Sequence, residues 1–141
     1  MIFPDSLHHT VPLPLHHTLN PAPRMDAYCE FLIAAGRRLT GVPENHPCAR
    51  VHGHTFRVRL TVSGPVDPVT GFVTDFADVQ RAFAPVHDAL DHRFLNDIPG
   101  LENPTSERLA TWVWDRLVGL LPGLSAVEIT ESGASGVVYR G

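Results

Sequence analysis

The sequence predicts an α+β fold in which an antiparallel sheet is segregated from two helices. Residues 55–63 alternate between apolar and polar side chains, which is typical of a strand with one buried face. Apolar residues recur at helical spacing over residues 76–90 and again over residues 104–121. Strand-like segments flank these two helical segments, so the expected order of elements is β-β-β-α-α-β-β.

The other strands are predicted from apolar runs and turn residues. Residues 27–38 are apolar with few breakers and should form the first strand. Prolines and glycines in residues 64–71 predict a turn that leads into a short third strand at residues 72–74. A last hairpin should pair residues 126–131 with residues 137–140 across a turn of Gly and Ser.

Both helices carry recognisable start signals. Asp75 should cap the first helix, and Pro85 should kink or restart it. The second helix should start around residues 104–107 and end before Pro122. Its buried stripe is expected to consist of Leu109, Trp112, Val113, Leu117 and Leu120.

Composition bounds the class of protein. The 141 residues suit one globular domain, with 43% hydrophobic and 18% charged residues. A net charge of −4 provides no basic field that would favour nucleic acid as a partner. No apolar run approaches the roughly 20 residues that span a bilayer, so no membrane partner is expected.

The N terminus differs in composition from the rest of the chain. Residues 1–25 hold five prolines and two histidine pairs, which predicts an extended arm preceding a domain of residues 26–141. The arm lacks the basic start and long apolar stretch of a secretion signal. The two cysteines, Cys29 and Cys48, are too few for a disulfide framework, so a cytoplasmic location is expected.

The stretch from Cys48 to His54 carries the strongest chemical signal. In an extended segment the side chains at i and i+2 leave the same face, so His52 and His54 can reach one metal ion. Gly53 removes the side chain between them and lets the backbone approach a ligand closely. A thiol beside two metal-ligand side chains indicates an enzyme site.

Five motifs occur in a fixed order along residues 27–141 and together resemble one family. They are Cys48-x3-His52-Gly53-His54, Gly71–Phe76, Leu90–Asn96, Pro104–Glu107 and Glu131. The chain resembles the 6-pyruvoyltetrahydropterin synthase family, and within it the bacterial 6-carboxytetrahydropterin synthase branch of queuosine biosynthesis.

This resemblance implies a fold, an assembly and a reaction. The fold would be a T-fold, a four-stranded antiparallel sheet with two helices on one face. Two stacked rings of three subunits would form a hexamer, with active sites between subunits. The reaction would convert 7,8-dihydroneopterin triphosphate to 6-carboxy-5,6,7,8-tetrahydropterin, with loss of triphosphate and a two-carbon fragment.

The resemblance also implies roles for individual residues. Cys48 would be the catalytic base, acting as a thiolate. Asp91 and His92 would form a proton relay. The side chains of adjacent residues diverge in a helix or strand, so the pairing needs loop geometry or a relay through a neighbouring residue. Glu131 would anchor the pterin by accepting two parallel N–H bonds. Thr105 and Ser106 would either bind the ring or cap the second helix.

Two features of the implied site stay open from the sequence. The triphosphate would require cations, for which the candidates are Arg37, Arg50, Arg57 and Arg93. His52 and His54 would bind zinc, but the position of the family's third histidine holds Arg37, which stays protonated and is no ordinary ligand. Three alternatives follow: a substitute ligand from His8, His9, His16 or His17, a weak two-histidine site completed by water or a nearby group, or a metal-free site in which Arg37 attracts a phosphate or carboxylate.

The presence of Arg37 in place of the family's third histidine favours two competing functions. One is a 6-pyruvoyltetrahydropterin synthase-like enzyme with an altered metal site and a different pterin substrate. The other is a non-catalytic paralogue that only binds a pterin. Retention of Cys48, Asp91, His92 and Glu131 together argues against simple decay of the site.

Overall fold

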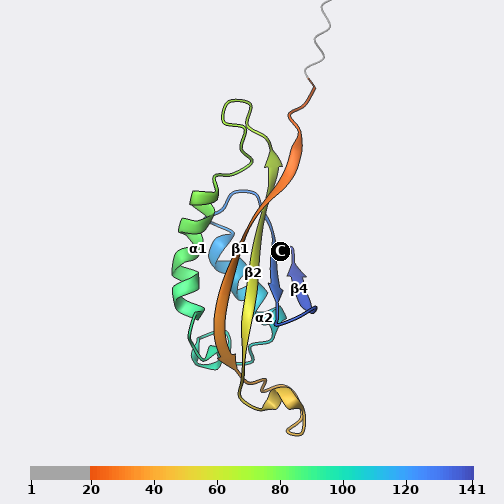
Figure 1. The fold of residues 1–141 in the computed structure, drawn as a ribbon, viewed down its shortest axis with the longest axis vertical. Coiled ribbons are helices and arrows are strands. Elements are labelled where there is room, and N and C mark those ends of the chain that lie inside the picture. The colour runs from red at the N-terminus through yellow and green to blue at the C-terminus, as the bar shows by residue number, and fades with distance from the viewer. Residues whose placement is uncertain (1–19) are drawn as a thin grey trace, which may run out of the picture.

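The computed structural model describes residues 20–141 and shows a four-stranded antiparallel sheet with two helices (Figure 1). The arm histidines lie outside the described residues. The sheet follows chain order and comprises β1 (Arg24–Arg37), β2 (His52–Pro65), β3 (Leu124–Thr130) and β4 (Gly136–Tyr139). The helices are α1 (Phe76–Leu90) and α2 (Ser106–Leu117). The predicted α+β class and T-fold architecture are therefore confirmed.

The first two strands form a long hairpin that dominates the sheet (Figure 1). They pair without a break from Arg24 opposite Pro65 to Arg37 opposite His52. β2 is longer than the predicted residues 55–63 because it begins at the histidine motif. This extension places His52 and His54 inside the sheet rather than in a loop.

The core lies between the sheet and the helices. Phe56, Val58, Leu60 and Val62 on β2 are buried, as their alternation predicts. Helix α1 packs on β1, and α2 packs on β3 and β4. Among residues 20–141, no helix has the length and apolarity that crossing a membrane requires.

Three details of the predicted elements are wrong. Residues 72–74 form no strand, because β2 already pairs with β1 on one side and with β3 on the other. The first helix does not restart at Pro85, which lies within the continuous helix α1 and is exposed to solvent. Leu120 is 63% exposed, because α2 ends at Leu117 and the following residues form a turn.

One end of the core is polar instead of apolar. The inward-facing side chains of β1 run from Ile33 through Ala35 to Arg37, all of them buried. Those of β2 run in the opposite direction from Phe56 through His54 to His52. The sheet therefore places Arg37, His52 and His54 at the same end of the layer between sheet and helices.

Candidate active site

Arg37 is the centre of the polar end of the core. Its residue surface is only 2% exposed, and its guanidinium lies over the Phe56 ring, 5.2 Å from the centroid. Nη2 donates to Glu131 Oε1 at 2.5 Å. Nη1 donates to the Pro104 carbonyl at 3.1 Å and to Ser106 Oγ at 3.4 Å. The guanidinium thus ties the end of β1 to the start of α2 and to the residue after β3.

The two histidines of the motif also face Arg37. Arg37 Nε lies 3.4 Å from His52 Nε2, and Arg37 Nη2 lies 3.3 Å from His54 Nε2. The imidazole rings are nearly perpendicular, with centroids 5.0 Å apart. Burial and the nearby Arg37 charge hold the pKa of His54 below its usual value, which favours the neutral imidazole.

Glu131 presents its two carboxylate oxygens differently. Oε1 accepts from Arg37 and, at 2.6 Å, from the Ser106 hydroxyl. Oε2 lies 3.9 Å from His54 Nε2. Burial would raise the pKa of Glu131, but the hydrogen bonds from Ser106 and Arg37 outweigh it and hold the pKa below the usual value. Glu131 is therefore a charged carboxylate whose Oε1 accepts two hydrogen bonds within the protein.

The structure separates the roles of the two hydroxyl residues at the start of α2. The Thr105 hydroxyl accepts from the Arg108 backbone N–H and caps the helix. Ser106 is 5% exposed and points to Arg37 and Glu131 instead. In this subunit, Thr105 fits the capping alternative, and Ser106 belongs to the polar cluster.

Asp91 and His92 form a hydrogen-bonded pair directly after α1. His92 has a φ of 56°, in the left-handed region, which turns its ring back toward its neighbour. His92 Nδ1 lies 2.8 Å from Asp91 Oδ2, while Asp91 Oδ1 accepts from the Ala34 N–H at 2.9 Å. The Ala34 bond and then the His92 bond hold the pKa of Asp91 below its usual value. The loop geometry that this pairing requires is present.

The left-handed backbone at His92 has a measurable consequence. Replacing His92 with alanine keeps a Cβ in a strained conformation, whereas replacing it with glycine removes that strain. We expect H92G to be more stable than H92A by about 1 kcal/mol. Urea unfolding of both variants measures the difference; H92A as the more stable variant would contradict the backbone assignment.

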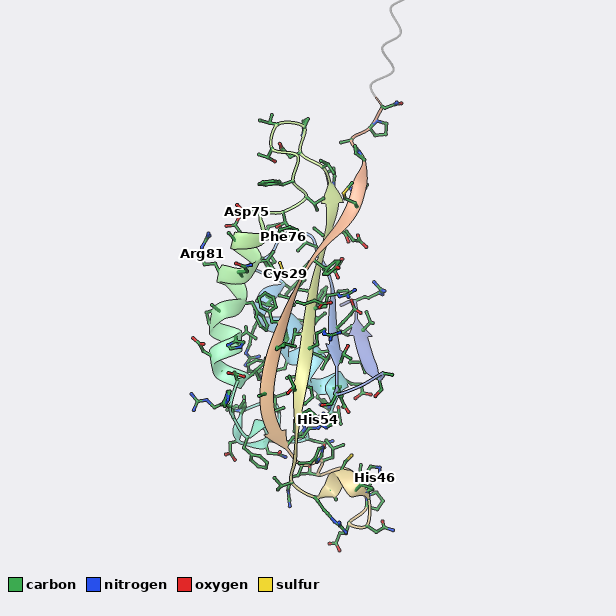
Figure 2. All side chains as sticks on the ribbon, viewed as in Figure 1. Cys29, His46, His54, Asp75, Phe76 and Arg81 are labelled. Atoms are coloured by element: carbon green, nitrogen blue, oxygen red, sulfur yellow. The ribbon has the colours of Figure 1, made fainter. Side chains whose placement is uncertain are left out.

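A groove of about 570 Å3 crosses the end of the β1–β2 hairpin. Gly36 and Gly53 face each other across the strands, so neither strand places a side chain of its own here, and the Phe94 ring lies 3.6 Å from the position that a Cβ on Gly36 would take. His54, His92, Arg93 and Ser132 are among the residues that line the groove. Figure 2 shows His54 at the end of the sheet that leads to the loop carrying His46. The groove gives a ligand access to the imidazoles of His54 and His92.

Cys48 lies in the loop between β1 and β2, within the short 3-10 turn η1 (Pro47–Ala49). Its carbonyl accepts from the Leu39 N–H, and its own N–H donates to His46 Nδ1. Within residues 20–141, no hydrogen bond joins its thiol to the imidazole or carboxylate groups of the site. The single chain thus assembles the arginine cluster and the Asp91–His92 pair but leaves Cys48 outside both.

The candidate phosphate-binding arginines have different surroundings. Arg37 is fully engaged inside the protein, as described above. Arg57 lies on the outer face of the sheet, 3.8 Å from Glu30. Arg50 is exposed and Arg93 lines the groove. Arg93 is therefore the best placed of the four to meet an anion in the groove.

The residues that the structure describes do not fit a zinc ion. Zinc would need the Nε2 lone pairs of His52 and His54, and both nitrogens face the cationic Arg37 guanidinium. Among residues 20–141, no group of three or more His, Cys, Asp or Glu side chains is arranged to hold a metal. The predicted zinc site is thus not supported by the geometry of its two histidines.

Comparisons with known proteins give a consistent match. The family model described as 6-pyruvoyl tetrahydropterin synthase matches residues 27–141. The chain is 39% identical over 119 residues to 6-carboxy-5,6,7,8-tetrahydropterin synthase of Synechocystis, covering 79% of this chain and 90% of that protein. It is 37% identical over 90 residues to dihydroneopterin monophosphate aldolase of Pyrococcus furiosus, covering 62% and 75% respectively.

The solved structures agree on the fold. That of Caenorhabditis elegans 6-pyruvoyl tetrahydropterin synthase matches with a TM-score of 0.79 at 24% identity. The match covers 87% of this chain and 99% of that one. At this identity the likeness concerns the fold alone.

Proposed function

Because the chain belongs to the 6-pyruvoyl tetrahydropterin synthase family, we propose that it is a lyase that converts 7,8-dihydroneopterin triphosphate to 6-carboxy-5,6,7,8-tetrahydropterin. Triphosphate and a two-carbon fragment are the other products. The name of the Synechocystis relative supports this product. A role in queuosine biosynthesis is part of the proposal and comes from the family resemblance. The structural observation that carries the proposal is the Asp91–His92 pair beside the groove.

The pair has the geometry of a proton relay. Asp91 is fixed by the Ala34 N–H, and its second oxygen orients the imidazole through Nδ1. The His92 side chain is 82% exposed, so its Nε2 is free to exchange a proton with a ligand in the groove. In the proposed reaction the Cys48 thiolate removes a proton from the pterin side chain, and His92 returns one.

Glu131 is the proposed anchor for the pterin ring. Its Oε2 can accept an N–H of the amino-pyrimidinone edge. Oε1 already accepts from Arg37 and Ser106, so a second ligand N–H must compete with these bonds. We therefore assign recognition of the ring chiefly to Oε2.

A hexamer built as two rings of three subunits would complete the site. Within residues 20–141, β1 and β4 are the outer strands of the sheet, and residues 92–94 already bond to the edge of β1 at Ala34 and Gly36. The remaining parts of the two edges can be extended by the sheet of a neighbouring subunit. Within one chain the Cys48 thiol is separate from the groove. In the hexamer, a second subunit could place its Cys48 at the groove of the first. The two free cysteines are compatible with a reducing cytoplasm.

The proposal is tested by incubating the purified full chain with 7,8-dihydroneopterin triphosphate. We expect release of triphosphate together with 6-carboxytetrahydropterin, identified by mass spectrometry. A 6-pyruvoyl product would support the pyruvoyl-forming alternative. Formation of neither product would refute the proposed lyase activity.

Replacing Asp91 with asparagine should impair turnover specifically. The D91N amide no longer stabilises the imidazolium that forms when His92 takes a proton, so we expect kcat to fall about 100-fold or more. Asp88→Asn is the matched control, because Asp88 lies in the last turn of α1, just before Asp91, and its side chain is 86% exposed. Equal rates for D91N and D88N would remove Asp91 from the relay.

A second candidate function is pterin binding without turnover. It is favoured by one observation: Arg37 occupies an oxygen of the anchoring carboxylate. A protein that binds a dihydropterin in calorimetry but releases no triphosphate would fit this function.

A further inference from the structure

Arg37 has no donor left for a ligand. A guanidinium carries five N–H groups. Nε donates to His52, Nη1 donates to Pro104 and Ser106, and Nη2 donates to His54 and Glu131. Its side chain is only 3% exposed. This arginine is therefore a structural element of the site and not a free cation that waits for a phosphate.

The partners of each imidazole fix the direction of these bonds. His52 Nδ1 lies 2.8 Å from the Arg50 carbonyl, which can only accept, so Nδ1 carries the proton. His54 Nε2 faces Arg37 Nη2, which can only donate, so the proton of the neutral ring is on Nδ1, 3.4 Å from the Ser132 hydroxyl. Both Nε2 atoms are then acceptors, the form that would also bind a metal. Here the guanidinium takes both lone pairs.

The charge of Arg37 is compensated inside the cluster. A buried cation is stable only when it is paired and hydrogen-bonded, and Glu131 provides that pairing. Moving the guanidinium aside to admit a metal would break this ion pair and leave Glu131 and Ser106 without their partner. A divalent cation would also be repelled by the guanidinium that remains nearby.

We propose that the Arg37 guanidinium replaces the zinc ion implied by the family resemblance. It holds His52 and His54 through their Nε2 atoms and joins them to Glu131, so that the site is organised by an arginine and is metal-free. This inference concerns metal content and is independent of the proposed reaction, so the two can fail separately.

The test is zinc content of the full-length protein and of two variants. Arg37→His removes the guanidinium and supplies a third imidazole beside His52 and His54. Arg38→His is the matched control, since Arg38 is the exposed neighbour of Arg37. We expect about one zinc per subunit for R37H and far less than one for the parent protein and for R38H. In addition, cobalt should give tetrahedral d–d absorption bands with R37H alone.

Two results would overturn the inference. The first is a parent protein that carries stoichiometric zinc, whether or not R37H folds. If that zinc disappears when His8, His9, His16 and His17 are changed to alanine in the full chain, the arm supplies the missing ligand. The second is a folded R37H protein that binds neither zinc nor cobalt, because then the two imidazoles are not arranged as ligands.

Discussion

Replacing Glu131 with alanine should lower the free energy of unfolding by about 3 kcal/mol. The change leaves the buried Arg37 charge without its counterion and the Ser106 hydroxyl without its acceptor. For a chain of this size the loss corresponds to a decrease in Tm of about 10 °C. Urea and thermal unfolding both measure it.

Glu128→Ala is the matched control, because Glu128 lies on β3 and pairs with the partly exposed Arg59 at 3.8 Å. A pair of this kind contributes about 1 kcal/mol or less. The double variant R37M/E131A should lose less stability than the sum of R37M and E131A, since it removes both charges together. Equal losses for E131A and E128A would show that Arg37 does not depend on Glu131.

Replacing Cys48 with alanine should reduce turnover at least about 100-fold while leaving pterin binding nearly unchanged. The variant removes the proposed base, but it removes none of the contacts that Glu131 and Ser106 make. Single-turnover assays with 7,8-dihydroneopterin triphosphate measure the rate, and calorimetry with a non-reactive dihydropterin measures binding.

Cys29→Ala is the control for loss of a thiol. Cys29 lies in the middle of β1, away from the end of the sheet that carries His54 (Figure 2). Burial raises the pKa of its thiol, which keeps Cys29 protonated. C29A should therefore retain full turnover. A C48A protein as active as C29A would exclude Cys48 as the base.

The fold was largely predictable because its main signals are local. Alternation along residues 55–63 identified β2, and Asp75 caps α1 as predicted, with its side chain accepting from the Ala77 N–H. The short strand at residues 72–74 was mispredicted because the sequence does not show that both sides of β2 are occupied by other strands.

The sequence names the residues of the candidate site but does not give their connections. The sequence showed that Arg37 replaces the family's third histidine. It did not show the partners of the guanidinium, because three of them lie 67, 69 and 94 positions further along the chain. One signal was present: Arg37 continues the inward-facing series of Ile33 and Ala35, which predicts burial and therefore a need for a carboxylate. The left-handed conformation of His92 had no comparable signal, because only the loop geometry reveals it.

The arginine cluster also affects which part of the sheet unfolds first. The Arg37 side chain on β1 is hydrogen-bonded to residues of β2, of the start of α2 and of the segment after β3. We therefore expect these segments to unfold together. At the far end of the hairpin, the Ser63 hydroxyl bonds to Asp26 on β1 and to Ser125 on β3, so that end is held by hydroxyl groups instead of an ion pair. We therefore expect local unfolding to begin at the Pro- and Gly-containing turn and to leave the groove in its folded shape.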